Sequence, residues 1–75
     1  MNKHQAKALA NLRRAERELG TANARRLMAE HMALFHNDEG WGEYEMNVNK
    51  WTRKYEAARQ GVARREWELR EAFRD

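Results

Sequence analysis

Three histidines and a group of glutamates are the side chains in this sequence best suited to chemistry. A helical zinc site needs two ligands three or four positions apart, but His31 and His36 are five apart and His4 is distant from both. Glutamates near the centre of the chain could act in acid–base catalysis only inside a pocket that shifts their pKa values. They are Glu30, Glu39, Glu43 and Glu45. The chain has no Ser and no Cys, so the usual nucleophile triads are missing. We therefore expect no enzyme activity, no metal and no cofactor.

The elements that must position any other kind of site are helices. Strong helix formers dominate the 75-residue chain, there is no proline, and the alternation typical of strands is missing. A single loop signal lies at residues 37–42, where two glycines follow an Asn-Asp pair. The sequence predicts one all-α domain over residues 1–75. It is an antiparallel helical hairpin, with long helices at 3–36 and 43–74 joined by that turn.

Each predicted helix has a candidate seam for packing against the other. In the second helix the seam follows alternating steps of four and three, as in a coiled coil. Its positions are Tyr44, Val48, Trp51, Tyr55, Ala58, Val62, Arg65, Leu69 and Ala72. In the first helix the large apolar residues predict a seam with one irregular step, a stutter that locally unwinds a supercoil. Its positions are Leu9, Leu12, Glu16, Leu19, Asn23, Leu27 and Leu34.

Folding the chain at the turn brings Glu16 opposite Arg65 and Gly20 opposite Gly61. A Glu16–Arg65 pair would set the register more than it would add stability, and the alternative is that both side chains extend into solvent. The two glycines indicate a close approach of the backbones. Alternatively, the first helix breaks at Gly20 and Thr21 caps a further segment, which would give three helices.

Several large apolar residues have no place in this hairpin. Met28, Met32 and Phe35 form a second stripe, and Met and Trp are enriched at interfaces. We expect this surface to be buried in a homodimer that closes into a four-helix bundle. We also expect a different protein as a partner, to which flexible methionines adapt, and the two expectations do not exclude each other. The expected partner-binding residues are Met28, Met32, Phe35, Trp41, Arg64, Trp67 and Arg70.

The basic residues offer a second possibility, RNA or DNA binding. The chain has 15 Lys and Arg against 12 Asp and Glu, a formal charge of +3. The alternative nucleic-acid-binding residues are Arg13, Arg14, Arg17, Arg25 and Arg26. In the second helix, glutamates interleave with the arginines, which is typical of a solvated, ion-paired face.

No apolar run approaches the roughly 18 residues of a membrane span. We expect no membrane contact, no small-molecule substrate and a cytoplasmic location.

A short helical hairpin without cysteine, rich in Arg and Ala and with spare Met and Trp, resembles two groups of proteins in architecture. One is the small helical accessory proteins of bacteriophages, some of which bind and inhibit host regulators or defence complexes. This resemblance implies a regulator in the host cytoplasm that inhibits a transcription regulator or a defence complex. The chain also looks like the plasmid copy-number RNA-binding family, whose hairpins dimerise into four-helix bundles. A purely structural coiled-coil adaptor is a third hypothesis.

Overall fold

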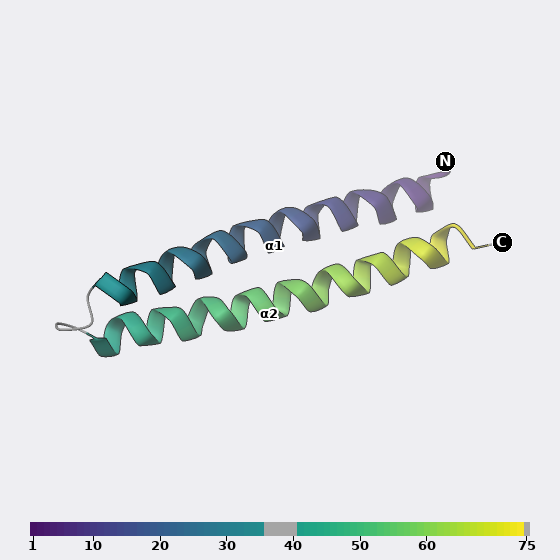
Figure 1. Ribbon diagram of the computed structural model, residues 1–75. Helices are drawn as coiled ribbons and strands as arrows, with labels where there is room; N and C mark the ends of the chain where they lie inside the picture. The colour runs from purple at the N-terminus through teal and green to yellow at the C-terminus, as the bar shows by residue number, and fades with distance from the viewer. Residues whose placement is uncertain (36–40, 75) are drawn as a thin grey trace.

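Two long helices lie side by side and run in opposite directions (Figure 1). The computed structural model describes residues 1–35 and 41–74, apart from the side chain of Trp41. Helix α1 comprises Lys3–Phe35 and helix α2 comprises Trp41–Ala72. The described residues contain no strand, so the predicted all-α hairpin is confirmed. Gly42, placed in the turn by the sequence, belongs to α2, and the predicted turn residues 37–40 lie outside the described ones.

Helix α1 begins with a reciprocal cap that also joins the two helices. The backbone N–H of Gln5 donates to Asn2 Oδ1 at 2.8 Å, and the backbone N–H of Asn2 donates to Gln5 Oε1 at 3.1 Å. This is a capping box, which satisfies two backbone donors at the helix start. Gln5 Nε2 also donates to the backbone carbonyl of Ala72 at 3.1 Å. The start of α1 is therefore fixed beside the end of α2.

The side of α1 that faces α2 is formed mainly by alanine. Four buried alanines recur at a strict spacing of seven: Ala8, Ala15, Ala22 and Ala29. With the buried Leu12 and Ala33 and the half-buried Gln5, Leu19 and Arg26, they define what we call the inner seam. Its steps alternate between three and four from residue 5 to residue 33. The stutter predicted for this helix is therefore wrong, because an uninterrupted heptad spacing faces α2.

The seam predicted for α2 is confirmed, since all nine of its positions are half-buried. Several of these α2 residues are large. The register of the two helices explains why alanines of the inner seam lie opposite several of them. Counting equal numbers of residues from the Gln5–Ala72 hydrogen bond along the two antiparallel helices places Leu19 at the level of Ala58 and Ala22 at the level of Tyr55. Large residues of one helix thus lie beside small residues of the other along most of the interface, whereas Leu12 lies level with Arg65 and Arg26 with Trp51. This complementarity fills the interface without fully burying any large side chain among the described residues.

Of the five leucines that the sequence placed in the α1 seam, Leu12 and Leu19 belong to the inner seam, whereas the other three lie outside it. Leu27 is 50% exposed and Leu34 is 75% exposed, whereas Leu9 is half-buried at the edge of the interface.

Glu16, which was expected to pair with Arg65, is also exposed. Its expected partner Arg65 instead donates to Glu68 Oε2 at 2.7 Å, three residues further along α2. The predicted Glu16–Arg65 pair is thus replaced by a pair within one helix.

The glycines at the middle of the hairpin neither break α1 nor bring the backbones together. Helix α1 continues through Gly20 and Thr21, so the three-helix alternative is wrong. A Cβ atom added at Gly20 or at Gly61 would meet no other group within 4 Å. Neither glycine is required by packing inside the hairpin.

In the described part of the chain, neither α1 nor α2 contains a stretch with the length and hydrophobicity of a membrane-spanning helix.

Candidate interaction surface

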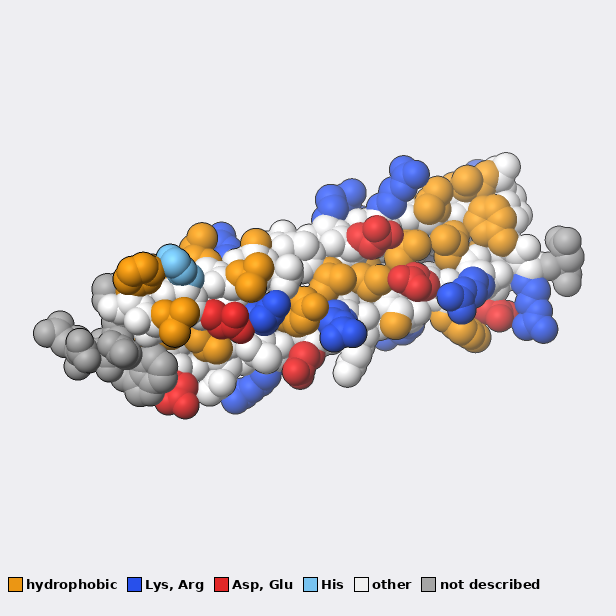
Figure 2. Space-filling view, viewed as in Figure 1, with side chains coloured by type: hydrophobic (Ala, Val, Ile, Leu, Met, Phe, Trp, Pro, Cys, Tyr) orange, Lys and Arg blue, Asp and Glu red, His pale blue; other side chains and the backbone are white. Residues whose placement is uncertain are grey.

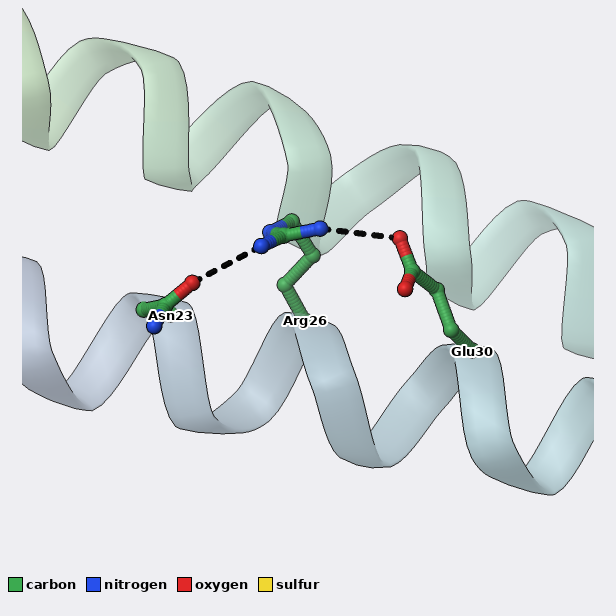
Figure 3. Close-up of polar contacts among 3 residues, drawn as sticks. All are labelled: Asn23, Arg26 and Glu30. Carbon is green, nitrogen blue, oxygen red and sulfur yellow. Dashed lines mark hydrogen bonds and ion pairs between the residues drawn. The ribbon is translucent and has the colours of Figure 1, made fainter.

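Arg26 is the one charged residue of the inner seam, and its guanidinium lies between the two helices (Figure 3). Nη2 donates to Asn23 Oδ1 at 2.8 Å and Nη1 donates to Glu30 Oε1 at 3.0 Å. The guanidinium carbon lies 4.6 Å from the centroid of the Tyr55 ring on α2, a cation–π contact. Buried Nε has no hydrogen-bond partner among the described residues. Arg26 therefore has a structural role in this hairpin.

This position changes the set of residues available for a nucleic acid. Arg26 belongs to the set predicted to contact phosphates, but its guanidinium group is engaged by Asn23, Glu30 and Tyr55. The remaining members of the predicted set are exposed: Arg13, Arg14, Arg17 and Arg25. At helical spacing these four residues spread over about 120° of the α1 surface, because successive residues are rotated by roughly 100°.

Large apolar side chains gather on the outside of the last turns of α1. We call them the α1 end patch, which consists of Leu27, Met28, Met32, Leu34 and Phe35, exposed by 40–75%. The ring of His31 packs edge-to-face on that of Phe35, with centroids 4.7 Å apart. The α1 residues buried against α2 at this level are Ala29 and Ala33. The small side chains of this segment thus point inward while its large ones point to solvent.

The predicted partner-binding residues fall into two separate places. Met28, Met32 and Phe35 belong to the α1 end patch, as the sequence indicated. Trp67 is 61% exposed and lies near the opposite end of the hairpin, with the exposed Arg64 and Arg70 one turn to either side of it.

The Gln5–Ala72 hydrogen bond places Trp67 at the level of residue 10. That level is about 27 Å from Met28 at a rise of about 1.5 Å per residue. The structure therefore does not bring Trp67 into the surface formed by the methionines. The side chain of Trp41, the remaining predicted contact, lies outside the described part of the chain.

A second heptad pattern follows the outer face of α1, away from α2. We call it the outer seam, and all nine of its positions are exposed: Ala6, Ala10, Arg13, Arg17, Gly20, Ala24, Leu27, His31 and Leu34. Its steps alternate between four and three over the whole helix, as those of the inner seam do. Sequence reasoning missed it because most of its apolar members are Ala or Gly. The signal that could have revealed it is the recurrence of alanine or glycine at positions 6, 10, 20 and 24 of this spacing, followed by leucine at positions 27 and 34.

Figure 2 shows how side-chain types are distributed along the edge of α1 that is uppermost in the view. Hydrophobic side chains appear toward both ends of this edge, and basic side chains lie between them. A histidine adjoins the hydrophobic group at the end of α1 that leads to α2. The outer face of α1 thus contains a basic middle and two apolar ends.

No group of three or more metal-ligating side chains is present in the described residues. No protein-family model, curated protein or solved structure matches this chain.

Proposed function

We propose that this chain is a small, non-enzymatic interaction module that binds a partner protein through the outer face of α1 and regulates it by covering part of its surface. One observation supports this most directly. At the level where Ala29 and Ala33 are buried against α2, five large apolar residues of the same helix remain exposed in the α1 end patch.

Burial of these exposed side chains would contribute a favourable free energy that the hairpin alone does not gain. Burying one large apolar side chain completely contributes about 1.5–3 kcal/mol. A contiguous apolar group on a soluble chain is a typical feature of a protein-binding surface. Methionine is well suited to such a surface, because its unbranched side chain adapts to the shape of a partner. A partner that covers the α1 end patch would therefore gain affinity from groups already placed at the surface.

The resemblance to small phage accessory proteins suggests the class of partner. We propose a host protein, either a transcription regulator or a defence complex, that is inhibited because the hairpin occupies a working surface. Nucleic-acid binding is less well supported. Arg26 is engaged inside the hairpin, and the exposed arginines of that set share the outer face of α1 with exposed apolar residues, which a nucleic acid would leave without an apolar contact.

The proposal is tested by purifying tagged protein from the cells in which it acts. The wild type, a Met32→Ala/Phe35→Ala double variant and a Gln60→Ala control would be compared, with bound proteins identified by mass spectrometry. Gln60 is exposed on α2, remote from the α1 end patch. We expect one partner to be retained by the wild type and the control and lost by at least tenfold from the double variant.

Circular dichroism of all three proteins would show whether the substitutions leave the helices intact. Equal recovery of every bound protein by the double variant and the wild type would contradict the proposal. So would recovery of nucleic acid alone, released as salt is raised.

A further inference from the structure

We infer that the outer seam of α1 binds an acidic amphipathic helix of the partner protein, packed lengthwise against the face of α1 opposite α2. This inference rests on the proposed function and specifies the partner that the module takes. The occupant is a helix with two acidic residues about one turn apart, flanked on both sides by apolar positions.

The outer seam has the geometry of a helix-packing surface. Its steps of four and three match those of the inner seam, which is packed against a helix in the hairpin itself. Gly20 lies at its middle, in the interior of a helix, where glycine is normally unfavourable. No group of the hairpin lies within 4 Å of a Cβ atom added there. The missing side chain leaves open space on the outside, where it allows another helix to approach closely.

The charges of the seam indicate the chemistry of that helix. Arg13 and Arg17 lie one turn apart near its middle, exposed, and take part in no ion pair within the described residues. Toward one end the seam continues with Ala6 and Ala10, and toward the other with Leu27 and Leu34 as its large members. A helix that covers the whole seam must therefore place carboxylates over the arginines, because desolvating unpaired guanidinium groups is costly.

The exposed area of the molecule agrees with an additional helix. The chain exposes 6150 Å². A compact monomer of 9.0 kDa is expected to expose about 4,900 Å². The difference, roughly 1,300 Å², is spread over all faces of the elongated hairpin, and it is larger than the roughly 800 Å² that each partner buries in a stable protein complex.

A second copy of this chain is a poorer occupant of the same face. The outer seam contains no acidic residue, so two copies paired through it would cover Arg13 and Arg17 of each copy without a seam carboxylate opposite them. A nucleic acid would pair with Arg13 and Arg17, but it would leave the apolar ends of the seam, Leu27 and Leu34 above all, without an apolar contact. Both are alternative outcomes of the test.

The test uses two synthetic helical peptides of about four heptads, each made in both chain directions. Both peptides have leucine at the positions that face the alanines and Gly20, and alanine at those that face Leu27 and Leu34. The first has glutamate at the two positions that face Arg13 and Arg17, and the second has lysine there. Binding to the full chain is measured by fluorescence anisotropy at moderate and at high salt. We expect the glutamate peptide to bind at least tenfold more tightly than the lysine peptide.

Variants of the chain show whether the peptide lies on the outer seam. In an Arg13→Glu/Arg17→Glu double variant, the preference should reverse in favour of the lysine peptide. Gly20→Leu should weaken binding of the glutamate peptide by at least tenfold, because the new side chain fills the space at the middle of the seam. Gln60→Leu adds the same side chain to the exposed face of α2 and should leave binding unchanged.

Several results would overturn the inference. They are equal binding of the two peptides, no binding of either, or binding that Gly20→Leu does not affect. Tighter binding of a single-stranded RNA than of the glutamate peptide at the same arginines would assign the face to nucleic acid. Self-association that the glutamate peptide displaces would assign it to a second copy. Failure of the peptide test alone, with partner loss still caused by Met32→Ala/Phe35→Ala, would leave the proposed function in place.

Discussion

Arg26 shows how one residue can be assigned to the wrong task from its type alone. In the sequence it is the second of two adjacent arginines, and such a pair is typical of a phosphate contact. In the hairpin it occupies a half-buried position of the inner seam, where its guanidinium donates to Asn23 and Glu30 and contacts the ring of Tyr55. The face of α1 on which Arg26 lies decides between these roles. That face can be identified only when the residues that pack against α2 are known.

This role predicts the effect of substituting Arg26. We expect Arg26→Leu to leave the free energy of unfolding unchanged or to raise it by up to about 1 kcal/mol, because a leucine fills the seam and removes the need to desolvate a charge. We expect Arg26→Ala to lower it by about 1–2 kcal/mol, because the stem packing and the cation–π contact are both lost. Urea denaturation followed by circular dichroism measures both changes. A leucine variant less stable than the alanine variant would contradict this account.

Glu16 and Arg65 offer a second test at the level of single residues. Since Glu16 is exposed and Arg65 pairs with Glu68, we expect the effects of Glu16→Ala and Arg65→Ala on stability to add. Arg65 and Glu68 should instead show a small coupling of about 0.3–0.5 kcal/mol, typical of pairs on a helix surface. Two double-mutant cycles by urea denaturation measure these terms. Coupling above about 1 kcal/mol between Glu16 and Arg65 would restore the register predicted from the sequence.

At the scale of the helices, most of the fold was predictable and the face of α1 was not. The helical composition and the loop signal located both helices to within two residues, and the large residues of α2 revealed its seam. In α1, Leu12 and Leu19 were predicted correctly, but Leu27 and Leu34 are exposed, and alanines at residues 8, 15, 22 and 29 form most of the real seam. Hydrophobicity alone favours leucine, but the bulky Tyr55 and Tyr44 of α2 lie level with Ala22 and Ala33, where small side chains are required. That requirement becomes visible only when the two helices are considered as a pair.

The alanine seam predicts a strong dependence on side-chain size. Ala29 is 3% exposed, and Ala29→Leu should force the helices apart and lower the free energy of unfolding by about 1–3 kcal/mol. Ala24→Leu, on the exposed face of the same helix, should change it by less than about 0.5 kcal/mol. Urea denaturation of both variants gives the comparison. Equal effects at the two positions would show that the alanines do not face α2.

Gly20 tests the continuity of α1. Because the helix runs unbroken through this position and nothing crowds it, Gly20→Ala should raise the free energy of unfolding by about 0.8–1 kcal/mol. For a chain of this size that corresponds to a rise in Tm of about 4–8 °C. Thermal unfolding followed by circular dichroism measures it. A lower Tm for the alanine variant would indicate that the helix breaks at this glycine after all.

At the scale of the whole molecule, the hairpin has two unlike outer sides. The outer face of α1 combines small residues, leucines and a pair of arginines at heptad spacing, whereas glutamates and arginines alternate along much of α2. The methionines and Phe35 were predictable as spare apolar residues. The separation of Trp67 from these residues was not predicted. It follows from the antiparallel arrangement, which places the end of α1 that carries the methionines far from the end of α2 that carries Trp67.

The central claim, that a partner protein binds the outer face of α1, is tested most directly by photo-crosslinking in cells. A photoreactive phenylalanine analogue would replace His31 on the outer seam in one protein and Gln60 on the exposed face of α2 in another. We predict a crosslink to one partner protein from position 31 and none from position 60. Equal crosslinking from both positions, crosslinks only to nucleic acid, or crosslinks only between two copies of the chain would contradict the account.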